Sequence, residues 1–386
     1  MRKITIIDTF STGHFHEVFN FCFLYSVLVG NRDATIFYHA DSYVISLIIN
    51  HAEKENVNLR RVVFKPIKII KGEKSWNILL RLVIGCILNI YFRIKTKNSI
   101  IYSQLNPFFG FLYPFWKKSK KKTYIVCHGE LEYLINTPPI YKPMYIYKKC
   151  LSLFFKYNFT DNLTLFVLGN SIKNNLLPHT ITNNYTNLKV VRHPYIFINN
   201  IISQKSMNHP LRIGLVGSLS KHQVFENLLE ISNHFEREIS QNKIKFIIIG
   251  SNKLAPDLYP LLTFLRREHG NSYYLDYDEL QDAINSLDYV MYLYPTNSYK
   301  LIASGAFFDA VNHKRPIIAL ENDYFLEFQN NYGSIGLLAS DITGLKDKIY
   351  EAIQGNYDNG ILQDIQNSFS NIRSDYSYRN ISETIE

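Results

Sequence analysis

The chain has 386 residues, 46% of them hydrophobic and 19% charged, which is enough apolar material for buried cores and excludes wholesale disorder. This length exceeds the ~250 to 300 residues that a single core supports, so two domains are expected. A surplus of 42 Lys and Arg over 33 Asp and Glu gives a net charge of +9, which favours anionic partners such as phosphates, nucleic acid or acidic lipid.

Seven short apolar runs in the first half of the chain, separated by longer periodic segments, predict parallel strands joined by crossover helices. The expected strands lie at residues 3–7, 34–38, 61–64, 99–103, 123–127, 164–168 and 188–191. The first of these runs is too short to be the hydrophobic part of a secretory signal, which favours a cytoplasmic protein. Residues 1–192 are therefore predicted to form an N-terminal Rossmann-like domain.

Cysteine usage agrees with a reducing compartment. No C-x-x-C pair occurs, so neither a zinc site nor a disulfide framework is predicted. The thiols are expected to be free and buried; they are Cys22, Cys86, Cys127 and Cys150.

Two loops of this domain carry groups that can move protons, and both follow predicted strands, where ligands of open α/β sheets bind. In DTFSTGHFHEV, after the first strand, the candidates are Thr12, Gly13, His14, His16 and Glu17. In YIVCHGELE, after the strand at 123–127, they are His128 and Glu130. A single histidine is more often structural, so packing is the alternative explanation for each.

Residues 76–95 are the most hydrophobic segment, but Arg81 and Arg93 interrupt it and argue against a membrane span. Polar residues at i, i+4 spacing predict a narrow polar stripe on an apolar helix. One interpretation is a core helix. The other is a helix seated on the membrane surface, which the basic run KKSKKK at 117–122, following FLYPFW, favours.

Two His-Pro pairs bracket residues 193–210, which are predicted to be a linker. The alternation of strands and helices then restarts, and a second Rossmann-like domain is expected over residues 211–357. Its expected strands lie at 211–217, 245–250, 273–277, 288–294, 316–320 and 334–339. Residues 358–386 have helical character and are expected to pack back on the first domain.

The stretch SYKLIASGAFFDAVNHKRPIIAL, residues 298–320, predicts a phosphate site at a helix N-terminus. Ser304 and Gly305 are small residues at the expected start of the helix, where they let a phosphate approach the backbone amides. Asp309 follows one turn later and is expected to accept from a ribose hydroxyl, and Lys300 can add a cation. The alternative is that Ser304 and Gly305 form an ordinary N-cap and that Asp309 is a surface carboxylate.

A second loop of this type follows the first strand of the second domain. In GLVGSLSKH, Gly217 and Ser218 form a small-residue turn and Lys221 supplies a cation, as a diphosphate requires. Two such loops at strand ends predict a nucleotide site in the second domain.

One competing motif is the D-x-D sequence of Asp276, Tyr277 and Asp278, which binds metal in other sugar transferases. Here it opens a helical segment, so Asp278 is better explained as a helix cap with Glu279 in the first turn. No metal and no cofactor are predicted.

In these residues the chain resembles the GT-B glycosyltransferases, and more loosely their retaining branch of capsule and lipopolysaccharide synthesis. That branch has an E-x7-E pattern with Glu-Ala and then Gly-x-Pro-Val. Here Asp309 and Ala310 stand in the place of Glu-Ala, and Arg315 and Pro316 precede the strand; the first acidic position holds Leu301. The resemblance implies an α/β fold of two tandem doubly wound Rossmann-like domains facing a cleft.

By this resemblance the second domain binds the nucleotide-sugar donor, and the first supplies catalytic groups and the acceptor site. The implied catalytic candidates are His128, Glu130, His14 and Glu17, with Thr12 and Gly13 at the acceptor. The donor candidates are Gly217, Ser218, Lys221, Lys300, Ser304, Gly305 and Asp309. The departing diphosphate would be stabilised by helix dipoles and lysine, without metal.

The sequence thus predicts a cytoplasmic, metal-independent glycosyltransferase (hexosyltransferase type) that moves a sugar from a nucleoside diphosphate to a saccharide, in surface polysaccharide synthesis. A polyprenyl-linked acceptor and peripheral contact with an anionic inner membrane are further expectations. The alternatives are a nucleotide-sugar 2-epimerase of the same fold, which needs no acceptor, and a non-catalytic nucleotide-sugar-binding protein. No nucleic-acid reader motif is found, so a nucleic-acid partner is not expected.

Overall fold

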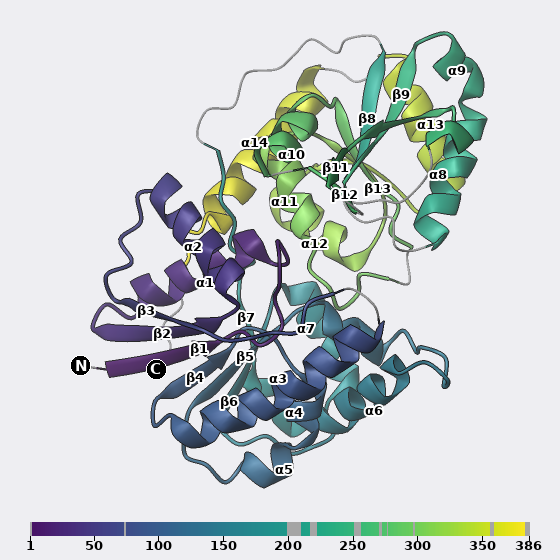
Figure 1. Cartoon of the computed structure of the whole chain (residues 1–386). Helices are drawn as coiled ribbons and strands as arrows, with labels where there is room; N and C mark the ends of the chain where they lie inside the picture. The colour runs from purple at the N-terminus through teal and green to yellow at the C-terminus, as the bar shows by residue number, and fades with distance from the viewer. Residues whose placement is uncertain are drawn as a thin grey trace. The chain divides into compact units, whose positions relative to one another are not determined.

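The computed structural model describes residues 2–72, 75–198, 210–216, 222–250, 256–269, 272–275, 277–295, 298–355 and 359–382 (Figure 1). The chain divides into two compact units. The first unit comprises Met1–Ile196, Lys300–Ala303 and Tyr376–Glu386, and the second comprises Phe197–Tyr299 and Ser304–Asp375. Each unit therefore draws on segments that are distant in the sequence.

The first unit is built on a seven-stranded sheet of order β3-β2-β1-β4-β5-β6-β7, in which every pairing is parallel. Strand β1, which lies between β2 and β4, is apolar and buried on both faces, as parallel sheets require; Ile4, Ile6 and Ile7 are at most 1% exposed. The strands are β1 (Arg2–Ile7), β2 (Ala34–Ala40), β3 (Val62–Pro66), β4 (Ser99–Tyr102), β5 (Thr123–Cys127), β6 (Leu163–Val167) and β7 (Leu188–Val190).

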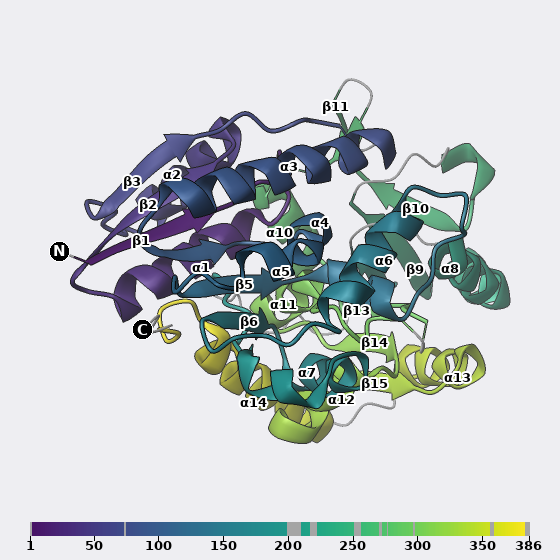
Figure 2. The same ribbon diagram turned by 90° about the horizontal axis from the view of Figure 1, so that it is seen from below.

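Helices cover both faces of this sheet. The helices α1 and α2 lie on one face, and α3, α4 and α5 lie on the other (Figures 1 and 2). Local chemistry sets their starts: the Asp41 side chain caps α2, and Asn106 caps α4 ahead of Pro107. The helices are α1 (Glu17–Gly30), α2 (Ser42–Lys54), α3 (Ser75–Lys95), α4 (Pro107–Phe111), α5 (Tyr113–Trp116), α6 (Met144–Phe154) and α7 (Asn170–Leu176).

The second unit has a six-stranded parallel sheet of order β10-β9-β8-β13-β14-β15. Its strands are β8 (Leu211–Val216), β9 (Ile244–Ile249), β10 (Leu262–Leu265), β13 (Tyr289–Tyr292), β14 (Ile317–Leu320) and β15 (Gly336–Ala339). Its helices are α8 (His222–His234), α9 (Glu236–Ser240), α10 (Tyr277–Asn285), α11 (Gly305–Asn312), α12 (Asp323–Tyr332), α13 (Ile342–Ile353) and α14 (Asn359–Tyr376). Leucine, isoleucine and phenylalanine side chains of strands and helices fill one core.

One predicted strand of this sheet was wrong. The segment at 273–277 contains β12 (Ser272–Tyr274), which pairs antiparallel with β11 (Arg267–His269) in a separate two-stranded sheet. The edge position belongs instead to β10, whose Leu262 is buried. Both runs are short and β-prone, so composition did not distinguish the strand that joins the sheet from the one that forms a hairpin.

The predicted polar stripe of α3 faces the protein interior. Arg81, Gly85, Asn89 and Arg93 are buried, whereas the apolar side of the helix is largely exposed. This inversion departs from the core-helix interpretation, which would bury the apolar side. Among the described residues, α3 is the one helix whose length and composition would suit a membrane span, although a third of its apolar window is buried.

The four thiols are free, as predicted; three are buried and Cys150 is partly exposed. Burial raises the pKa of the Cys22 and Cys127 thiols well above its ordinary value. They therefore act as small apolar core residues.

Candidate functional site

Each sheet has a position where the strand order reverses, between β1 and β4 in the first unit and between β8 and β13 in the second. Ligands of open α/β sheets bind beyond the carboxyl ends of the strands at such positions. The predicted loop after β8 contains Gly217, Ser218 and Lys221, which lie outside the described residues. The loops after β1 and β5 are described, as is the loop after β13 apart from residues 296–297, and they hold the other candidates.

The loop after β1 is held in place by a buried carboxylate. Asp8 Oδ1 accepts hydrogen bonds from the amides of Phe10 (3.0 Å) and Ser11 (2.9 Å), and Asn20 donates to Oδ2 (3.3 Å). Gly13 has a positive φ of 58°, and a Cβ built there would meet no atom within 4 Å. The loop thus has open space at Gly13, and contact of Thr12 and Gly13 with an acceptor stays a prediction.

Glu17 binds two histidines at once. Its Oε2 lies 2.6 Å from His14 Nδ1 and its Oε1 lies 2.8 Å from His51 Nε2. The Tyr43 hydroxyl is 3.1 Å from the other ring nitrogen of His14. Burial by itself would raise the pKa of Glu17, but hydrogen bonds from His51 and His14 lower it overall. The carboxylate is thereby kept ionised and fixed, while the His14 side chain is 47% exposed.

The loops after β1 and β5 meet through stacked imidazoles. The rings of His16 and His128 lie 4.3 Å apart at 27°, and Phe19 packs edge-on against His128 at 4.6 Å. His16 adopts the left-handed conformation (φ 58°) immediately before α1, which turns it toward this stack. The sequence placed the two histidines in separate loops; the fold brings them together.

His128 is held in one tautomer. Its Nε2 lies 3.0 Å from the Ser103 carbonyl oxygen, which can only accept, so Nε2 carries the proton and Nδ1 keeps its lone pair. Burial, aided by the nearby His16 and His193, holds the pKa of His128 well below its ordinary value. The ring is therefore neutral at physiological pH, with its lone pair on Nδ1.

Glu130 turns inward. It is 4% exposed; its Oε1 accepts from the His128 amide (2.8 Å) and its Oε2 from Gln104 Nε2 (3.5 Å). Burial raises the pKa of Glu130 to about 7, although these hydrogen bonds oppose the shift. The geometry suits a group that holds the His128 loop; direct catalysis by Glu130 stays a prediction.

We expect the first unit to be sensitive to acid. Burial lowers the pKa of His16 to about 3 and that of His193 to about 4, whereas both protonate near 6.5 when unfolded. The unfolded state then binds more protons below pH 6.5, so stability falls as pH falls from about 6.5 toward 4. Glu130 has the opposite effect on stability. Its pKa is raised to about 7 in the folded state, so its contribution to stability grows as pH falls over this range.

Thermal melts from pH 7 to pH 4.5 test this expectation. The melting temperature should drop on acidification, and His16→Asn, which tolerates the left-handed backbone and does not titrate, should show a smaller drop. An equal drop in the variant and the unmodified protein would contradict the assignment.

In the second unit, the N-terminus of α11 has the predicted form. The Ser304 hydroxyl accepts from the Phe307 amide (3.2 Å), and Gly305 is the first helical residue. The amides of Gly305 and Ala306 precede the first intrahelical donor, so the helix itself leaves them unpaired. A Cβ at Gly305 would meet nothing within 4 Å, which leaves open space beside these donors.

Asp309 lies one turn into α11, and its carboxylate already accepts a hydrogen bond from within the second unit. Gln281 Nε2 donates to its Oδ1 (3.2 Å), while Gln281 Oε1 accepts from Asn312 (2.7 Å) and lies 2.9 Å from His313 Nε2. This network ties α10 to α11 and fixes the carboxylate. Contact between Asp309 and a ribose stays a prediction.

An aromatic pair lies beside the start of α11. The rings of Tyr294 and Tyr299 stack at 3.7 Å and 13°. Burial raises the pKa of Tyr294, although the nearby Ser304 side chain opposes the shift. Tyr299 has a positive φ of 59°, unusual for a residue with a Cβ. This pair was not predicted; its one signal in the sequence is the two tyrosines on either side of PTNS.

The segment Lys300–Ala303 groups with the first unit. The Leu301 amide donates to Glu132 Oε2 (3.0 Å), and Asn175 Nδ2 donates to the Lys300 carbonyl (3.0 Å). Leu301, the residue at the absent acidic position, is fully buried. Within the described ranges no partner of the Lys300 side chain is found, and its role toward a phosphate stays a prediction.

The D-x-D motif falls partly outside the described residues, because Asp276 is not described. Helix α10 begins at Tyr277, so Asp278 lies in its first turn and is not the cap that the sequence predicted. No group of three His, Cys, Asp or Glu residues in the described ranges could hold a metal ion.

Two further contacts were not expected. Ser103 contacts His128 through its backbone carbonyl oxygen, a role that no sequence pattern can reveal. His193, assigned to the linker by its His-Pro pair, lies 5.1 Å from Phe19 by ring centroids and joins the histidine group. Polar residues flanking a proline were treated as linker, which hid this histidine.

No family model and no curated protein matches the sequence. Solved structures do match in fold, at low identity. Sucrose-phosphate synthase from Thermosynechococcus elongatus is 11% identical, with a TM-score of 0.63 over 99% of this chain and 96% of its own. HepE from Anabaena, solved with UDP, is 12% identical, with a TM-score of 0.61 over 99% and 97%. A TarM variant from S. aureus, solved with Fondaparinux, alpha-GlcNAc-glycerol and UDP, is 14% identical, with a TM-score of 0.60 over 99% and 98%.

These likenesses span almost the whole of each chain. A glycosyltransferase from Rickettsia africae ESF-5 is 10% identical, with a TM-score of 0.59 over 98% of this chain and 95% of its own. Together with the two parallel sheets, these likenesses confirm the predicted fold: the chain has the GT-B architecture of two Rossmann-like units. At 10 to 14% identity the likeness establishes the fold alone.

Proposed function

We propose that this protein is a glycosyltransferase that moves a sugar from a nucleoside-diphosphate donor to a saccharide acceptor. The observation that carries the proposal is the start of α11 at the strand-order reversal, where the helix itself provides no partner for the amides of Gly305 and Ala306 and a Cβ at Gly305 would meet nothing within 4 Å. Such a helix terminus attracts phosphate through its N–H groups and its dipole. Proteins of the same fold have been solved with UDP and UDP-glucose.

The first unit supplies the remaining parts of the proposal. His128, neutral and with a free Nδ1 lone pair, is suited to take the acceptor proton or to contact the donor sugar. Glu130 and Glu17 hold the two histidine-bearing loops, and the open space at Gly13 leaves room for an acceptor that Thr12 and Gly13 would contact. Helix dipole and lysine would neutralise the departing diphosphate without a metal ion.

The finer parts of the proposal are the hexosyl donor, a role in surface polysaccharide synthesis, and a lipid-linked acceptor at the cytoplasmic face of the membrane. The basic net charge of +9 and the amphipathic α3 support the last of these. Isothermal calorimetry with UDP, ADP, GDP and TDP tests the donor site first. No binding of any of these would defeat the proposal.

We predict that Gly305→Ala weakens UDP binding about tenfold without loss of stability. The backbone there accepts alanine, since Gly305 is not among the glycines with a positive φ. The methyl group, however, fills the open space beside the two amides. Calorimetry gives the affinity, and thermal melting gives the stability.

Gly344→Ala is the matched control, since Gly344 lies in the first turn of α13 and its added Cβ makes an ordinary 3.5 Å contact with Ala339. It should leave UDP affinity unchanged. If Gly305→Ala also binds UDP normally, the diphosphate does not reach the start of α11.

A nucleotide-sugar epimerase is the second candidate, because a putative UDP-N-acetylglucosamine 2-epimerase from Listeria monocytogenes has a similar structure. It is 10% identical, with a TM-score of 0.51 over 100% of this chain and 98% of its own. Incubation with donor alone separates the two functions. An epimerised sugar nucleotide formed without acceptor would favour the epimerase.

A further inference from the structure

Helix α3 presents an unbroken apolar surface to solvent. Every exposed residue between Trp76 and Ile94 is aliphatic or aromatic. The exposed fractions reach 71% at Trp76, 60% at Ile87 and 73% at Ile94. We call this surface the α3 face; its residues are Trp76, Leu80, Val83, Ile87, Tyr91 and Ile94. Their spacing of three and four residues puts them on one side of the helix.

The opposite side of α3 is polar and tied to the first unit. Arg81 donates to the carbonyls of Ile70 (2.7 Å) and Gly72 (2.8 Å), and Thr9 donates to Asn89 Oδ1 (3.3 Å). Arg93 donates to Thr123 Oγ1 (2.6 Å) and lies over the Trp116 ring. A helix with polar residues inward and apolar residues outward has the pattern of one that borders lipid.

The region around the α3 face is strongly basic. Residues 74–129 contain ten Lys and Arg and no Asp or Glu, which exceeds the +9 net charge of the whole chain. Lys118, Lys120 and Lys122, in the loop after α5, are exposed. Basic side chains beside an apolar surface attract anionic headgroups.

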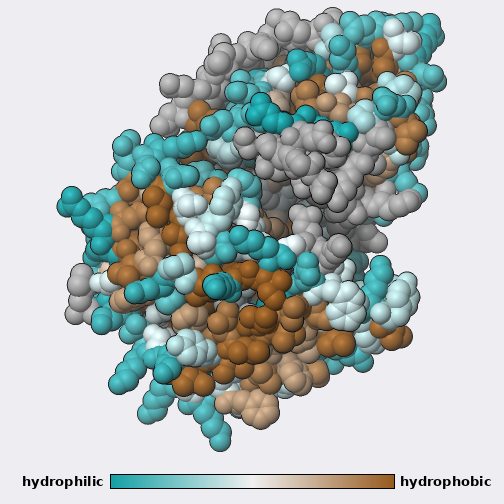
Figure 3. All heavy atoms as spheres, in the orientation of Figure 1, coloured by the Kyte–Doolittle hydropathy of each residue, from teal (hydrophilic) through white to brown (hydrophobic). Residues whose placement is uncertain are grey.

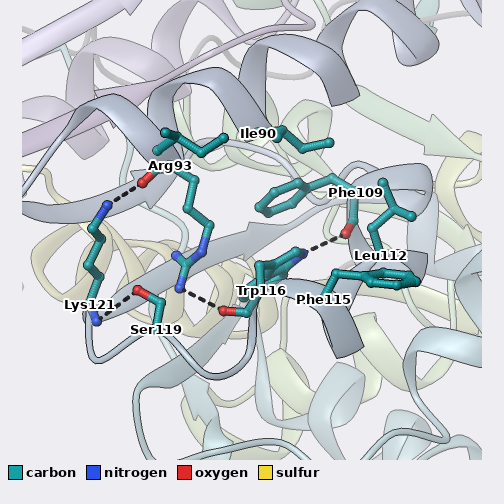
Figure 4. Close-up of a pocket in the computed structure, with 9 residues that line it drawn as sticks. Ile90, Arg93, Phe109, Leu112, Phe115, Trp116, Ser119 and Lys121 are labelled. Carbon is teal, nitrogen blue, oxygen red and sulfur yellow. Dashed lines mark hydrogen bonds between the residues drawn. The ribbon is translucent and has the colours of Figure 1, made fainter.

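The apolar surface continues from α3 onto α4 and α5, where it forms the large brown area of Figure 3. Phe115 is 83% exposed, and a pocket of about 390 Å³ opens beside it. Ile90, Ile94 and Leu112 line this pocket together with Lys121 (Figure 4). An apolar pocket with a cationic side chain in its wall matches a lipid chain with an anionic head.

We propose that the first unit docks on anionic bilayers through the α3 face, with Lys118, Lys120 and Lys122 at the headgroups and the pocket beside Phe115 open to a lipid chain. Trp76 and Tyr91, near the two ends of the α3 face, are residue types that favour the interface between lipid and water. This inference concerns a surface and stands apart from the proposed chemistry.

Two other occupants of the α3 face fit less well. A second copy of the chain would bring the exposed Lys118, Lys120 and Lys122 against the same lysines of its partner, whereas an anionic bilayer complements them. A membrane-spanning α3 would have to break the contacts of Arg81 and Arg93 within the first unit and carry both charges into hydrocarbon. Docking in the plane of the interface keeps those contacts.

Co-sedimentation with phosphatidylcholine vesicles, with and without phosphatidylglycerol, tests the proposal. The protein should pellet with the anionic vesicles, and Ile87→Glu with Ile94→Glu should lower the partition coefficient about 100-fold. The matched control places two glutamates on exposed apolar positions of the second unit, Leu258→Glu with Tyr350→Glu, and should still bind. Equal binding by the two double variants would overturn the proposal.

The charge contribution is tested separately. Replacing Lys118, Lys120 and Lys122 by Gln should weaken partition about fivefold per lysine, since each basic residue contributes about 1 kcal/mol at an anionic surface. A control that replaces the exposed Lys3, Lys189 and Lys245 removes the same charge elsewhere and should have little effect. Equal loss in both triple variants, or equal binding to neutral vesicles, would contradict the proposal.

Tryptophan fluorescence reports the depth of contact. Trp76 is highly exposed, so its emission should shift to the blue on addition of anionic vesicles, and the shift should vanish in Trp76→Phe, which still pellets. Absence of both the shift and pelleting, with a reversible dimer in sedimentation velocity that the double Glu variant abolishes, would assign the α3 face to a second copy instead.

Discussion

Replacing His128 by alanine is expected to lower kcat for sugar transfer about 10²- to 10⁴-fold while UDP affinity stays within about twofold. The imidazole is neutral, its Nε2–H is committed to the Ser103 carbonyl, and its Nδ1 lone pair is held in a buried loop at a strand end. Alanine removes that base, whereas the amides proposed to hold the diphosphate belong to α11 of the second unit.

Two further variants separate chemistry from packing at His128. In His128→Gln the side-chain amide can still donate to Ser103, so the loop should persist while transfer stays as low as in the alanine variant. Phe19→Leu removes the edge-on ring contact and should reduce stability by about 1 kcal/mol while leaving kcat nearly unchanged. Normal turnover in His128→Gln, measured by UDP release with donor and acceptor, would show that the ring only packs.

The strands were the most predictable part of this fold, because buried parallel strands are short apolar runs whose burial the sequence reports directly. β1, β2, β5 and β14 lie where their apolar runs predicted. The hairpin of β11 and β12 was not predicted, since sheet membership depends on pairing partners far along the chain. The orientation of α3 was also beyond the sequence: the polar stripe was visible, but which side faces the protein depends on Thr9, Ile70 and Thr123.

The candidate site was predictable to the level of loops. Small residues and histidines after apolar runs located the loops of Gly13, His128 and Ser304, because strand ends of a parallel sheet gather at one edge. The contacts inside the loops were not predictable. The stack of His16 on His128 joins residues 112 positions apart, and Ser103 acts through its backbone. Side-chain identity alone carries no signal for either contact.

Gly336→Ala is expected to unfold the second unit, with a loss of at least about 3 kcal/mol. Gly336 has a φ of +147° and pairs with Ile317 at the start of β15. A Cβ there would lie 2.1 Å from the Ile317 carbonyl oxygen and 2.5 Å from its amide nitrogen. Because these atoms are backbone of the neighbouring strand β14, no side-chain rotation relieves the clash.

The positions of the two tryptophans allow unfolding of the second unit to be measured separately from that of the first. Trp76 and Trp116 both belong to the first unit, so tryptophan emission follows that unit alone, while far-ultraviolet circular dichroism follows both. Without denaturant, Gly336→Ala should lack the part of the dichroism signal that the second unit contributes, and in urea its tryptophan transition should stay in place. Unchanged dichroism would mean that β15 pairs without the glycine. UDP binding should disappear in Gly336→Ala, because the second unit itself is lost when Gly336 can no longer pack against β14. In Gly305→Ala the fold should persist and UDP binding should only weaken, because Gly305 leaves room for the proposed ligand and not for a neighbouring strand.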